Sequence, residues 1–569
     1  MIDLWLESAL LHNEAVFEFS RGVTVIVGPN NAGKSQFLRD VYSALARPAY
    51  EDTSPQSFRR LQIGSATPRD LARQHLSEQL EARDNGVGGV VFSWSNGAIQ
   101  EGSALQVWEH MRSFAELQQL LVQLLSADAR LSLVQSQPSF DTTGLPASPL
   151  QRLYVDRALE TRVSKEAEAA FGTPLTLHRY RGSIISLHVG RPTRPETVPP
   201  EPSEYLHELN SLPEVSAQGD GIRSYVGMIL SIAAGTQQLV LLDEPEAFLH
   251  PPQARAFGRF LATVASEGMQ VVVATHSSDL IQGLTSVPRP PELLSIARLT
   301  RKDRETPDLA SIPPESLRKL YRDPLLKFTG TLDGLFYHGA CVCEAEGDCT
   351  YYSATLESDR VTAPDEPWLR RDIHFTHTNG KDRIAAAVAA IRSAGVPVAS
   401  ILDIDVLRDE TTFNAIVLAH GGSVEALSGR RNDVVGYADS LSHGAVRSEA
   451  LTAIGPILSA AGPRELTPDE SRQVAMAARP SSGWRELKRA GRSLMRGGVL
   501  ASFDSLVADL SQIGMFILAS GELESLHPEV SARNKSDWLG QVLESEAFRA
   551  PGDQHLLVSN LTKFVDQSQ

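Results

Sequence analysis

The stretch "VTVIVGPNNAGKSQFLRDVYSAL", Val23 to Leu45, decides the fold of the first part of the chain. An apolar run leads directly into G-x-x-x-x-G-K-S, and a segment with apolar residues at helical spacing follows. A strand, a glycine-rich loop and a helix in this order form a P-loop, in which backbone N–H groups and the helix N-terminus hold phosphate oxygens. This pattern predicts an ATP site with Ser35 reaching Mg²⁺. The residues expected to bind the nucleotide are Asn30, Asn31, Gly33, Lys34 and Ser35.

Two later apolar runs end in residues that suit the same chemistry. "LVLLDE" ends with Asp243 and Glu244, and "VVVATH" ends with His276. In P-loop enzymes, the acid at such a strand end organises Mg²⁺ and an adjacent glutamate polarises the attacking water, so we assign these roles to Asp243 and Glu244. His276 would sense the terminal phosphate; the alternative is a solvated or helix-capping histidine.

These motifs together resemble the ABC-type ATPases of the SMC and recombination-repair group. Within "EAFLHP", residues 246–251 resemble the D-loop of that group. The segment "SAQGDGIRSYVGMILSI" resembles its signature segment, with Ser216, Asp220 and Gly221 nearest the family pattern, although "AQGDG" departs from the usual serine-glycine-glycine core. The resemblance implies head-to-head pairs in which Gly221 contacts the nucleotide of the partner.

Length and composition limit the class of protein. A chain of 569 residues exceeds what one core usually serves, so we expect at least two domains. The net charge of -16 argues against a protein coated in positive charge, but a local basic groove could still bind nucleic acid. Three cysteines make no disulfide framework, and the sequence shows no signal segment or membrane-spanning run. We therefore expect a cytoplasmic protein with no membrane partner.

The region between the first two motifs is longer than a compact ATPase core needs, which predicts an insertion. "ALQVWEHMRSFAELQQLLVQLLSADARLSLV", residues 104–134, has apolar residues at helical spacing. We expect a helical insertion over about residues 100–215, which either pairs subunits or packs within its own domain. A proline-rich and charged segment from Ser286 predicts that the ATPase domain, residues 1–325, ends near residue 325.

The second half, residues 326–569, alternates apolar strands with helical segments, which predicts a parallel α/β domain. Sites in such sheets lie beyond the carboxyl ends of the strands, where this sequence has Glu344, Asp403 and Asp405. Strand residues two apart share a face, so the two aspartates should point the same way. With Glu344 they would hold one or two divalent cations, Mg²⁺ or Mn²⁺; the alternative is a solvated turn at the strand end.

This half resembles a TOPRIM domain, with a glutamate after the first strand and an Asp-x-Asp after a later one. An ABC-type ATPase fused to a TOPRIM domain resembles the OLD (overcoming lysogenisation defect) nucleases, the group that includes the Gabija antiphage nuclease. The family pattern Glu-Gly-x-x-Asp is replaced here by "EAEGD", so either Glu344 or Glu346 could lie at the metal. The resemblance favours Glu344, since Asp348 then takes the next acidic position.

The resemblance extends to a later strand and to a second insertion. "MFILASGELESLHPEVSARNK" is similar to the last metal-site strand of the family and its trailing lysine. It implies Glu524 as a further metal ligand and Lys535 as a catalytic residue that stabilises transition-state charge. The interval over about residues 410–510 would be a helical insertion in the TOPRIM fold.

Two smaller features have alternative interpretations. Cys341 and Cys343 lie in an expected buried strand, so we interpret the cysteines as core residues rather than zinc ligands. The segment from Arg479 to Gly498 gathers arginines and lysines around Trp484 and could contact a DNA backbone; a solvated helix face is the alternative.

Taken with the two resemblances, the sequence predicts an ATP-regulated, metal-dependent DNA endonuclease in defence against phage or other foreign DNA. Its expected partners are DNA and further copies of the chain, as a homodimer or higher homo-oligomer. An accessory helicase or another defence protein is a further candidate partner. The alternative is an ATP-driven DNA clamp or sensor that does not cut.

Overall fold

The computed structural model describes residues 3–47, 56–84, 89–94, 97–140, 146–197, 201–301, 307–313, 330–442, 447–459, 465–477, 482–532 and 534–568. The chain divides into two compact units, residues 1–314 and 315–569. The domain boundary expected near residue 325 falls outside the described residues.

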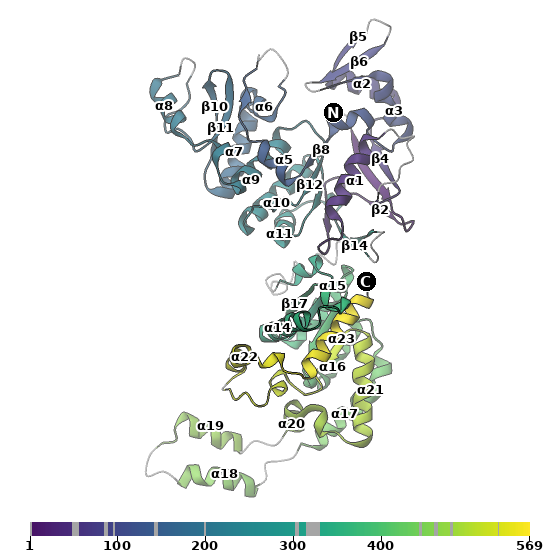
Figure 1. Ribbon diagram of the computed structural model, residues 1–569, viewed down its shortest axis with the longest axis vertical. Helices are drawn as coiled ribbons and strands as arrows, with labels where there is room; N and C mark the ends of the chain where they lie inside the picture. The colour runs from purple at the N-terminus through teal and green to yellow at the C-terminus, as the bar shows by residue number, and fades with distance from the viewer. Residues whose placement is uncertain are drawn as a thin grey trace. The chain divides into compact units, whose positions relative to one another are not determined.

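Unit 1 is built around a six-stranded sheet with the order β15-β14-β3-β13-β12-β8. Figure 1 labels three of its strands, β8, β12 and β14. Neighbouring strands are parallel from β14 to β8, and β15 runs antiparallel at one edge. The strands are β3 (Val23–Val27), β8 (Val122–Leu125), β12 (Leu239–Asp243), β13 (Gln270–Ala274), β14 (Leu294–Arg301) and β15 (Pro307–Ile312). β3 and β13 are buried at every position, as strands covered on both faces are. The carboxyl ends of β3, β13 and β12 therefore meet at one edge of the sheet.

Unit 1 also contains three antiparallel sheets, with the orders β2-β1-β4, β5-β6-β7 and β10-β11-β9. Their strands are β1 (Leu4–Leu10), β2 (Val16–Glu18), β4 (Arg60–Ser65), β5 (Glu81–Asp84), β6 (Val90–Trp94), β7 (Gly97–Gln100), β9 (Gln137–Pro138), β10 (Leu175–Arg181) and β11 (Ile184–Val189). The helices are α1 (Lys34–Ala46), α2 (Arg69–Gln79), α3 (Glu101–His110), α4 (Gln118–Leu121), α5 (Ala127–Ser132), α6 (Pro149–Val155), α7 (Arg157–Phe171), α8 (Ser203–Ser211), α9 (Asp220–Ala234), α10 (Pro251–Ser266) and α11 (Ser278–Ser286), with 3-10 turns η1 (Ala115–Leu117), η2 (Val215–Ala217) and η3 (Pro291–Leu293).

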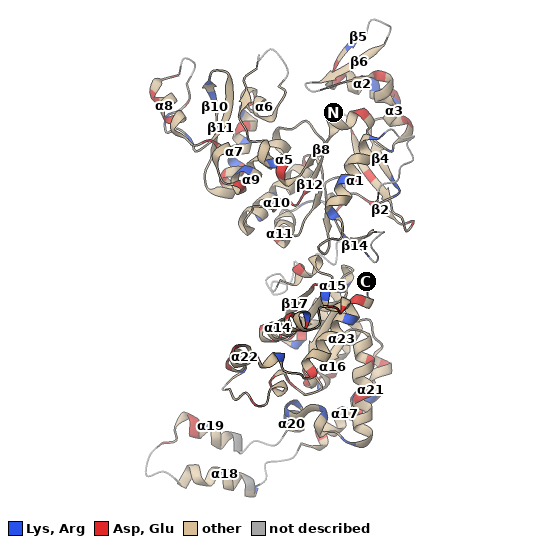
Figure 2. Ribbon diagram, in the orientation of Figure 1, with Lys and Arg blue, Asp and Glu red and all other residues tan. Residues whose placement is uncertain are grey.

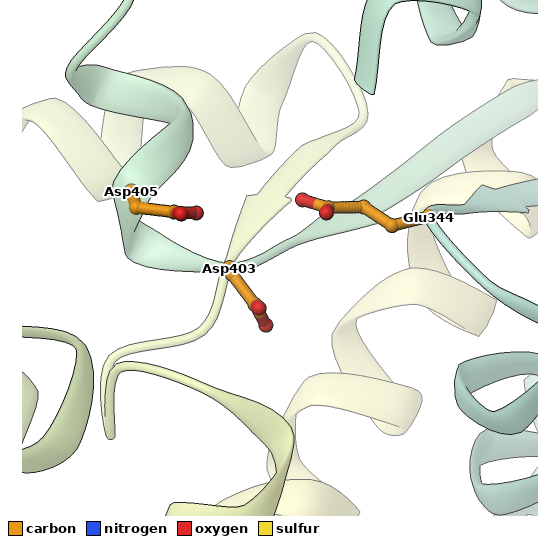
Figure 3. Close-up of side chains that lie close together, drawn as sticks. All are labelled: Glu344, Asp403 and Asp405. Carbon is orange, nitrogen blue, oxygen red and sulfur yellow. The ribbon is translucent and has the colours of Figure 1, made fainter. Parts of the chain in front are cut away.

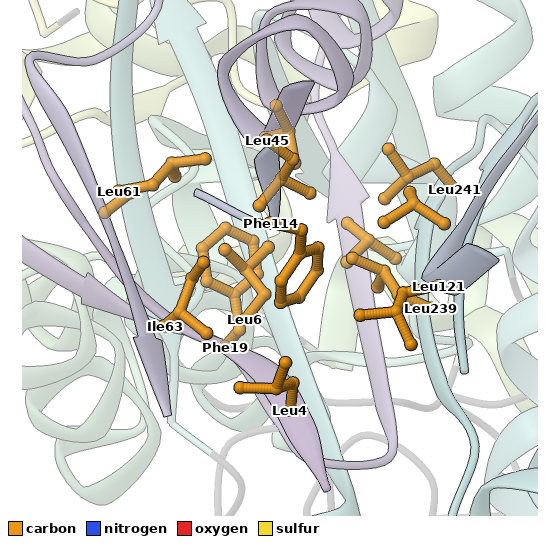
Figure 4. Close-up of a cluster of buried hydrophobic side chains, with 14 of the residues drawn as sticks. Leu4, Leu6, Phe19, Leu45, Leu61, Ile63, Phe114, Leu121, Leu239 and Leu241 are labelled. Atoms are coloured by element: carbon orange, nitrogen blue, oxygen red, sulfur yellow. The ribbon is translucent and has the colours of Figure 1, made fainter. Parts of the chain in front are cut away.

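One hydrophobic core joins the first antiparallel sheet to α1 and the central sheet (Figure 4). Leu6 of β1, Leu45 of α1 and Leu241 of β12 are all fully buried in it. Burying each such side chain contributes about 1.5–3 kcal/mol. This core fixes α1, and with it the start of the P-loop helix, against the central sheet.

The segment expected to form a helical insertion, about residues 100–215, contains strands as well as helices. The segment does hold α3 to α8, but Val122–Leu125 form β8, the edge strand of the central sheet, and β9, β10 and β11 form a small antiparallel sheet. Leu120, Leu121 and Leu125 are buried against the domain itself. Residues 104–134 therefore pack within their own domain. The apolar residues at helical spacing in this segment include the short strand β8, which the pattern did not indicate.

Unit 2 contains a four-stranded sheet with the order β17-β16-β18-β19, in which every neighbouring pair is parallel. The strands are β16 (Gly339–Cys343), β17 (Ile373–His377), β18 (Val398–Leu402) and β19 (Met515–Ile517). Helices α14 (Glu346–Thr362) and α15 (Ile384–Ser393) follow β16 and β17, so the predicted parallel α/β alternation is confirmed. Cys341, Cys343 and Cys349 are free and buried, which confirms their interpretation as core residues.

Among the described residues a run of helices separates β18 from β19, where the sequence predicted a helical insertion over about residues 410–510. It comprises α16 (Glu410–Ala419), α17 (Val424–Ser440), α18 (Arg447–Ser459), α19 (Pro468–Ala477), α20 (Gly483–Ala490), η8 (Gly491–Leu494) and α21 (Gly497–Gln512). The remaining elements are η4 (Thr331–Phe336), η5 (Pro367–Arg370), η6 (Lys381–Arg383), η7 (Ile404–Leu407), η9 (Leu523–Leu526), α22 (Lys535–Glu544), η10 (Ala547–Arg549) and α23 (Asp553–Gln567). Among the described helices, none has the length and apolar character required to cross a bilayer.

Candidate nucleotide and carboxylate sites

The glycine-rich loop of unit 1 connects β3 to α1 and depends on two glycines. Gly28 has a φ of +145° and Gly33 a φ of +98°. A Cβ on Gly28 would lie 2.2 Å from the carbonyl oxygen of Leu299 in β14, so a larger residue does not fit. Asn31 has a φ of 60°, a left-handed conformation that asparagine tolerates better than most residues. The loop has the backbone that a phosphate cradle requires.

Lys34 and Ser35 begin α1 beside the end of β12. Lys34 Nζ donates hydrogen bonds to the carbonyl oxygens of Gly28 and Pro29, both at 2.9 Å. Burial lowers the pKa of Lys34 to about 8, although nearby acids oppose the shift. Ser35 Oγ donates to Asp243 Oδ1 at 2.8 Å, so the two oxygens expected to share Mg²⁺ are already in contact.

Glu244 and His276 lie together beyond β12 and β13. Glu244 Oε1 is 3.4 Å from His276 Nε2. Burial lowers the pKa of His276 to about 4, so its imidazole is neutral at neutral pH. Glu244 has a φ of 46°, a left-handed conformation that costs about 1 kcal/mol outside glycine. This strain is located at the residue expected to polarise water, where strained backbone is often found.

A buried arginine that the sequence did not point to supports these residues. Arg130 of α5 is 0% exposed, and its Nη1 donates to the carbonyl oxygens of Asp243 and Glu244, both at 3.1 Å. Burial lowers the pKa of Arg130. No motif indicates this role, because Arg130 lies 113 positions before Asp243 in the sequence.

The segment that resembles an ABC signature lies at the start of α9. Ser216 lies in η2, where its Oγ donates to Glu214 Oε2 at 3.0 Å, and Gly221 is the second residue of α9. A Cβ on Gly221 would lie 2.8 Å from the carbonyl oxygen of Phe248, within residues 246–251. The signature-like and D-loop-like segments therefore contact each other within one chain. Contact of Gly221 with the nucleotide of a partner stays a prediction.

Glu344, Asp403 and Asp405 come together at the carboxyl edge of the sheet in unit 2. One carboxylate oxygen from each lies within 4.8 Å of the other two. Figure 3 shows Glu344 and Asp405 pointing toward one another, whereas the side chain of Asp403 leaves the backbone in a different direction. We call these three residues the carboxylate triad.

The expectation that strand alternation aligns the two aspartates is wrong. β18 ends at Leu402, Asp403 is the N-cap of η7, and Asp405 lies inside that 3-10 turn. The backbone N–H of Ile404 donates to the carbonyl oxygen of Gly521 at 2.9 Å, which fixes the turn against the segment after β19. The turn, not the strand, therefore places Asp405 opposite Glu344.

The charges of the triad depend on burial and on nearby lysines. Burial raises the pKa of Glu344 to about 7, and the two aspartates add to the shift. Burial also raises the pKa of Asp403. For Asp405, burial acts in the same direction, but hydrogen bonding and charge from Lys381 and Lys488 outweigh it and the pKa is lowered. Glu344 is therefore the triad residue that holds a proton near neutral pH.

Two lysines that sequence reasoning did not assign to this site contact the triad. Lys381 of η6 pairs with Asp405 Oδ1, and its Nζ lies 4.0 Å from Glu344 Oε1. Lys488 of α20 lies 3.2 Å from Oδ2 of both Asp403 and Asp405. These lysines come from a loop beyond β17 and from the helical insertion. The triad is thus neutralised by cations from distant parts of the sequence.

The other predicted residues surround the triad without joining it. Asp348 accepts a hydrogen bond from the Ala345 N–H at 3.0 Å and pairs with Lys535 Nζ at 2.9 Å. Glu346 is exposed at the start of α14, so the geometry places Glu344, and not Glu346, in the triad. Glu524 lies in η9 outside the triad, and its role as a ligand stays a prediction.

A cavity of about 830 Å³ adjoins these residues. Its lining includes Arg489, Arg492, Glu522, Glu524, Lys535 and Trp538. Glu522 Oε2 is 3.8 Å from Lys488 Nζ, so the cavity wall continues to the cations of the triad. Figure 2 shows basic residues on α20. In the chain, α20 is followed directly by η8, which includes Arg492. Lys488 belongs to the basic segment, residues 479–498, for which the sequence suggested contact with a DNA backbone.

Comparison with known proteins supports the assignment of a nucleotide site in unit 1. The family described as "AAA domain, putative AbiEii toxin, Type IV TA system" matches residues 161–282, which include Asp243, Glu244 and His276. No curated protein matches this sequence.

Solved structures similar to this chain include heads of SMC proteins. One is an Smc head bound to the C-winged helix domain of ScpA, with 12% identity, a TM-score of 0.33, and coverage of 56% of this chain and 98% of that chain. The SMC head domain from Thermotoga maritima has 12% identity and a TM-score of 0.29 over 55% of this chain and 98% of that chain. An Smc head from Pyrococcus furiosus, bound to the C-terminal domain of ScpA, has 10% identity and a TM-score of 0.34 over 56% and 98%.

The family match falls on the strands and loops that carry the acids of the nucleotide site, and the P-loop geometry completes that site. Unit 1 is therefore a P-loop ATPase domain.

Proposed function

We propose that the protein is an ATP-regulated, divalent-metal-dependent DNA endonuclease that acts in defence against phage or other foreign DNA. The observation that carries this proposal is the carboxylate triad, whose oxygens lie within 4.8 Å of one another in a unit separate from the nucleotide motifs. A glutamate after β16 and an Asp-x-Asp after β18 also correspond to the TOPRIM arrangement that the sequence suggested.

The residues of the triad fit a hard divalent cation such as Mg²⁺ or Mn²⁺. Glu344 Oε1 is a buried oxygen that accepts no hydrogen bond from any described residue. Carboxylate oxygens are the ligands that such ions prefer. Glu344, Asp403 and Asp405 would hold the ion, with Asp348 and Glu524 proposed as further acids around it. When bound, the ion supplies activation of water and stabilisation of the leaving oxygen.

The basic residues of the unit have separate tasks in this proposal. Lys381 and Lys488 hold Asp405 in place until the ion binds. Lys535, fixed by Asp348, offers positive charge to the phosphate at the wall of the cavity. Arg489 lines the same cavity and would contact the DNA backbone, since guanidinium groups bind phosphate strongly.

ATP bound in unit 1 would regulate the cutting site through assembly. Lys34, Ser35 and Asp243 bind the nucleotide with Mg²⁺, and Glu244 polarises water for hydrolysis. We propose that Gly221 and its neighbours meet the nucleotide of a second copy, in a homodimer or a higher homo-oligomer. An accessory helicase or another defence protein would supply the trigger in the cytoplasm.

A non-cutting DNA clamp is the second candidate, and one observation favours it. Lys381 and Lys488 already compensate the charge of the aspartates, so the site is electrostatically balanced without any ion. A clamp would bind DNA in an ATP-dependent way and would leave it intact.

Cleavage of supercoiled plasmid separates the two candidates. The protein is incubated with plasmid in Mg²⁺, in Mn²⁺ or in EDTA, each with and without ATP. The nuclease predicts nicked or linear DNA in the metal samples only. Intact plasmid in every sample, together with ATP-dependent retention of DNA on a filter, would instead support the clamp.

A further inference from the structure

Arg130 connects the end of β12 to helix α9. On one side, its Nη1 donates to the carbonyl oxygens of Asp243 and Glu244 at 3.1 Å. The N–H of Glu244 donates to the carbonyl oxygen of Ala274 at 2.9 Å. The carbonyl oxygen of Glu244 also accepts a hydrogen bond from the N–H of Ala247 at 3.0 Å. Both polar groups of the strained Glu244 backbone are therefore bonded, and Arg130 is the side chain among these partners.

The other side of Arg130 faces α9. The carbonyl oxygen of Arg130 packs so closely on Gly227 that a Cβ there would lie 2.2 Å away. Arg223 Nη2 donates to the carbonyl oxygen of Leu131 at 3.2 Å, and Met228 Sδ lies 3.8 Å from Arg130 Nη1. Arg223 and Gly227, one turn apart on α9, thus contact α5 at Leu131 and Arg130. A shift of α9 would move the guanidinium with it.

Packing alone does not account for an arginine at this place. Nε and Nη2 of Arg130 are buried and have no hydrogen-bond partner among the described residues. Burying a charged group with open donors is costly, and a well-packed apolar side chain would avoid that cost. The two bonds to Asp243 and Glu244 are what an apolar residue could not provide.

We propose that Arg130 is a positioning residue for ATP hydrolysis, which transmits the position of α9 to Glu244 and sets turnover without taking part in nucleotide binding. α9 begins with Asp220 and Gly221, the residues expected to meet a partner. Binding of a partner to the start of α9 would thus change the position of Glu244 in the same chain. The inference concerns the ATPase of unit 1 and does not depend on DNA cleavage.

The test compares Arg130→Met and Arg130→Lys in the full-length protein, with nucleotide affinity and ATP turnover measured separately. We expect Arg130→Met to keep its dissociation constant for ATP within about two-fold and to lose about 10- to 100-fold in kcat, as supporting residues of a site typically do. Arg130→Lys should recover part of kcat, since its ammonium can still donate to one of the carbonyls. A rescue of this kind is not expected from a role in packing alone.

Arg152→Met is the matched control. Arg152 is also an arginine whose pKa burial lowers, and its Nη1 donates to a single carbonyl oxygen, that of Gly235 at the end of α9, at 3.1 Å. It does not contact Asp243 or Glu244, so kcat should stay within about two-fold of wild type. Unchanged kcat in Arg130→Met, or a loss of ATP binding in step with turnover, would overturn the proposal.

Gly227→Ala tests the α9 side of the link and decides the matter if Arg130→Met does not fold. The added methyl group would press on the Arg130 carbonyl oxygen and displace α5 from α9. We expect kcat to fall about ten-fold with ATP affinity retained. A folded Gly227→Ala protein with normal turnover would show that α9 does not act through Arg130.

Discussion

The nucleotide site and the carboxylate triad are built on the same plan but use lysine in opposite ways. Both lie beyond the carboxyl ends of neighbouring parallel strands. In unit 1, Lys34 bonds to carbonyl oxygens of its own loop, and burial lowers its pKa to about 8. In unit 2, Lys488 pairs with two aspartates, whose charges raise its pKa in spite of burial.

The difference indicates how each site meets its ligand. The loop of unit 1 presents a phosphate cradle that is formed by local backbone, and Lys34 needs only to exchange carbonyl oxygens for phosphate oxygens. The triad presents acids that are already paired with lysines, so the proposed divalent cation would have to compete with Lys381 and Lys488. We therefore expect binding at the first site to be set by the loop, and binding at the second by the release of lysines.

The largest expected effect separates two roles within the nucleotide site. Lys34→Ala should weaken ATP binding about 100-fold, because the charge that meets the terminal phosphates is lost. Glu244→Gln should bind ATP normally and lose hydrolysis about 100-fold or more, because the base is lost. Fluorescent-nucleotide titration and phosphate release measure the two effects. Equal loss of binding in both variants would contradict this division.

A smaller effect is expected where α9 would face a partner. Gly219 is exposed and a Cβ there meets no atom within 4 Å, so Gly219→Glu is accommodated within one chain. The new carboxylate would repel the phosphates of a partner's nucleotide, and ATP turnover should fall about ten-fold at unchanged ATP affinity. Gly102→Glu on α3, an equally open and exposed position, is the control. Normal turnover in Gly219→Glu would argue against pairing through α9.

Competition between lysine and metal predicts a gain of affinity. Lys488→Met removes the ammonium that bridges Asp403 and Asp405, so Mn²⁺ should bind about ten-fold more tightly, and the protein should melt at a lower temperature in EDTA. Isothermal titration with Mn²⁺ measures the first effect. Lys535→Met, which removes a partner of Asp348 outside the triad, should change Mn²⁺ affinity much less. Weaker Mn²⁺ binding in Lys488→Met would contradict the competition.

The smallest expected effect is a pH dependence of nucleotide binding. Because the pKa of Lys34 is lowered to about 8, the lysine is charged below pH 8 and loses its proton above it. ATP affinity should therefore be constant from pH 6.5 to 7.5 and then fall by up to about ten-fold per pH unit above 8. Lys34→Arg, which keeps its charge, should show a flat profile. A flat profile in the wild-type protein would refute the assignment.

The contrast between the sites also determines how much the sequence could predict. The P-loop is contiguous, so its strand, loop and helix could be predicted together, and the parallel alternation of unit 2 could be predicted from apolar runs separated by helical segments. β8 could not be predicted, because a four-residue edge strand has no periodicity of its own inside a helical pattern. Glu344, Asp403 and Asp405 could be proposed from the strand ends alone.

Contacts that depend on packing between distant segments escaped prediction. Arg130 and Lys488 reach their carboxyl-edge sites from a short helix after β8 and from the helical insertion. No sequence spacing relates Arg130 to Asp243 and Glu244, or Lys488 to the two aspartates. Each reaches its partners only because the sheets and helices pack together. Asp405 was placed on the right edge for the wrong reason, because a turn and a strand both bring residues two apart to the same edge.

Cleavage of plasmid DNA by the double variant Asp403→Ala, Asp405→Ala tests the central claim most directly. Assays in Mg²⁺ and Mn²⁺ are run beside ATP hydrolysis and thermal melting, with the exposed Asp365→Ala as a control. The predicted result is complete loss of cleavage with ATP hydrolysis nearly unchanged, because the change removes the proposed metal ligands in unit 2 and leaves the P-loop of unit 1 intact. Retained cleavage by a normally folded double variant would contradict the assignment of the triad.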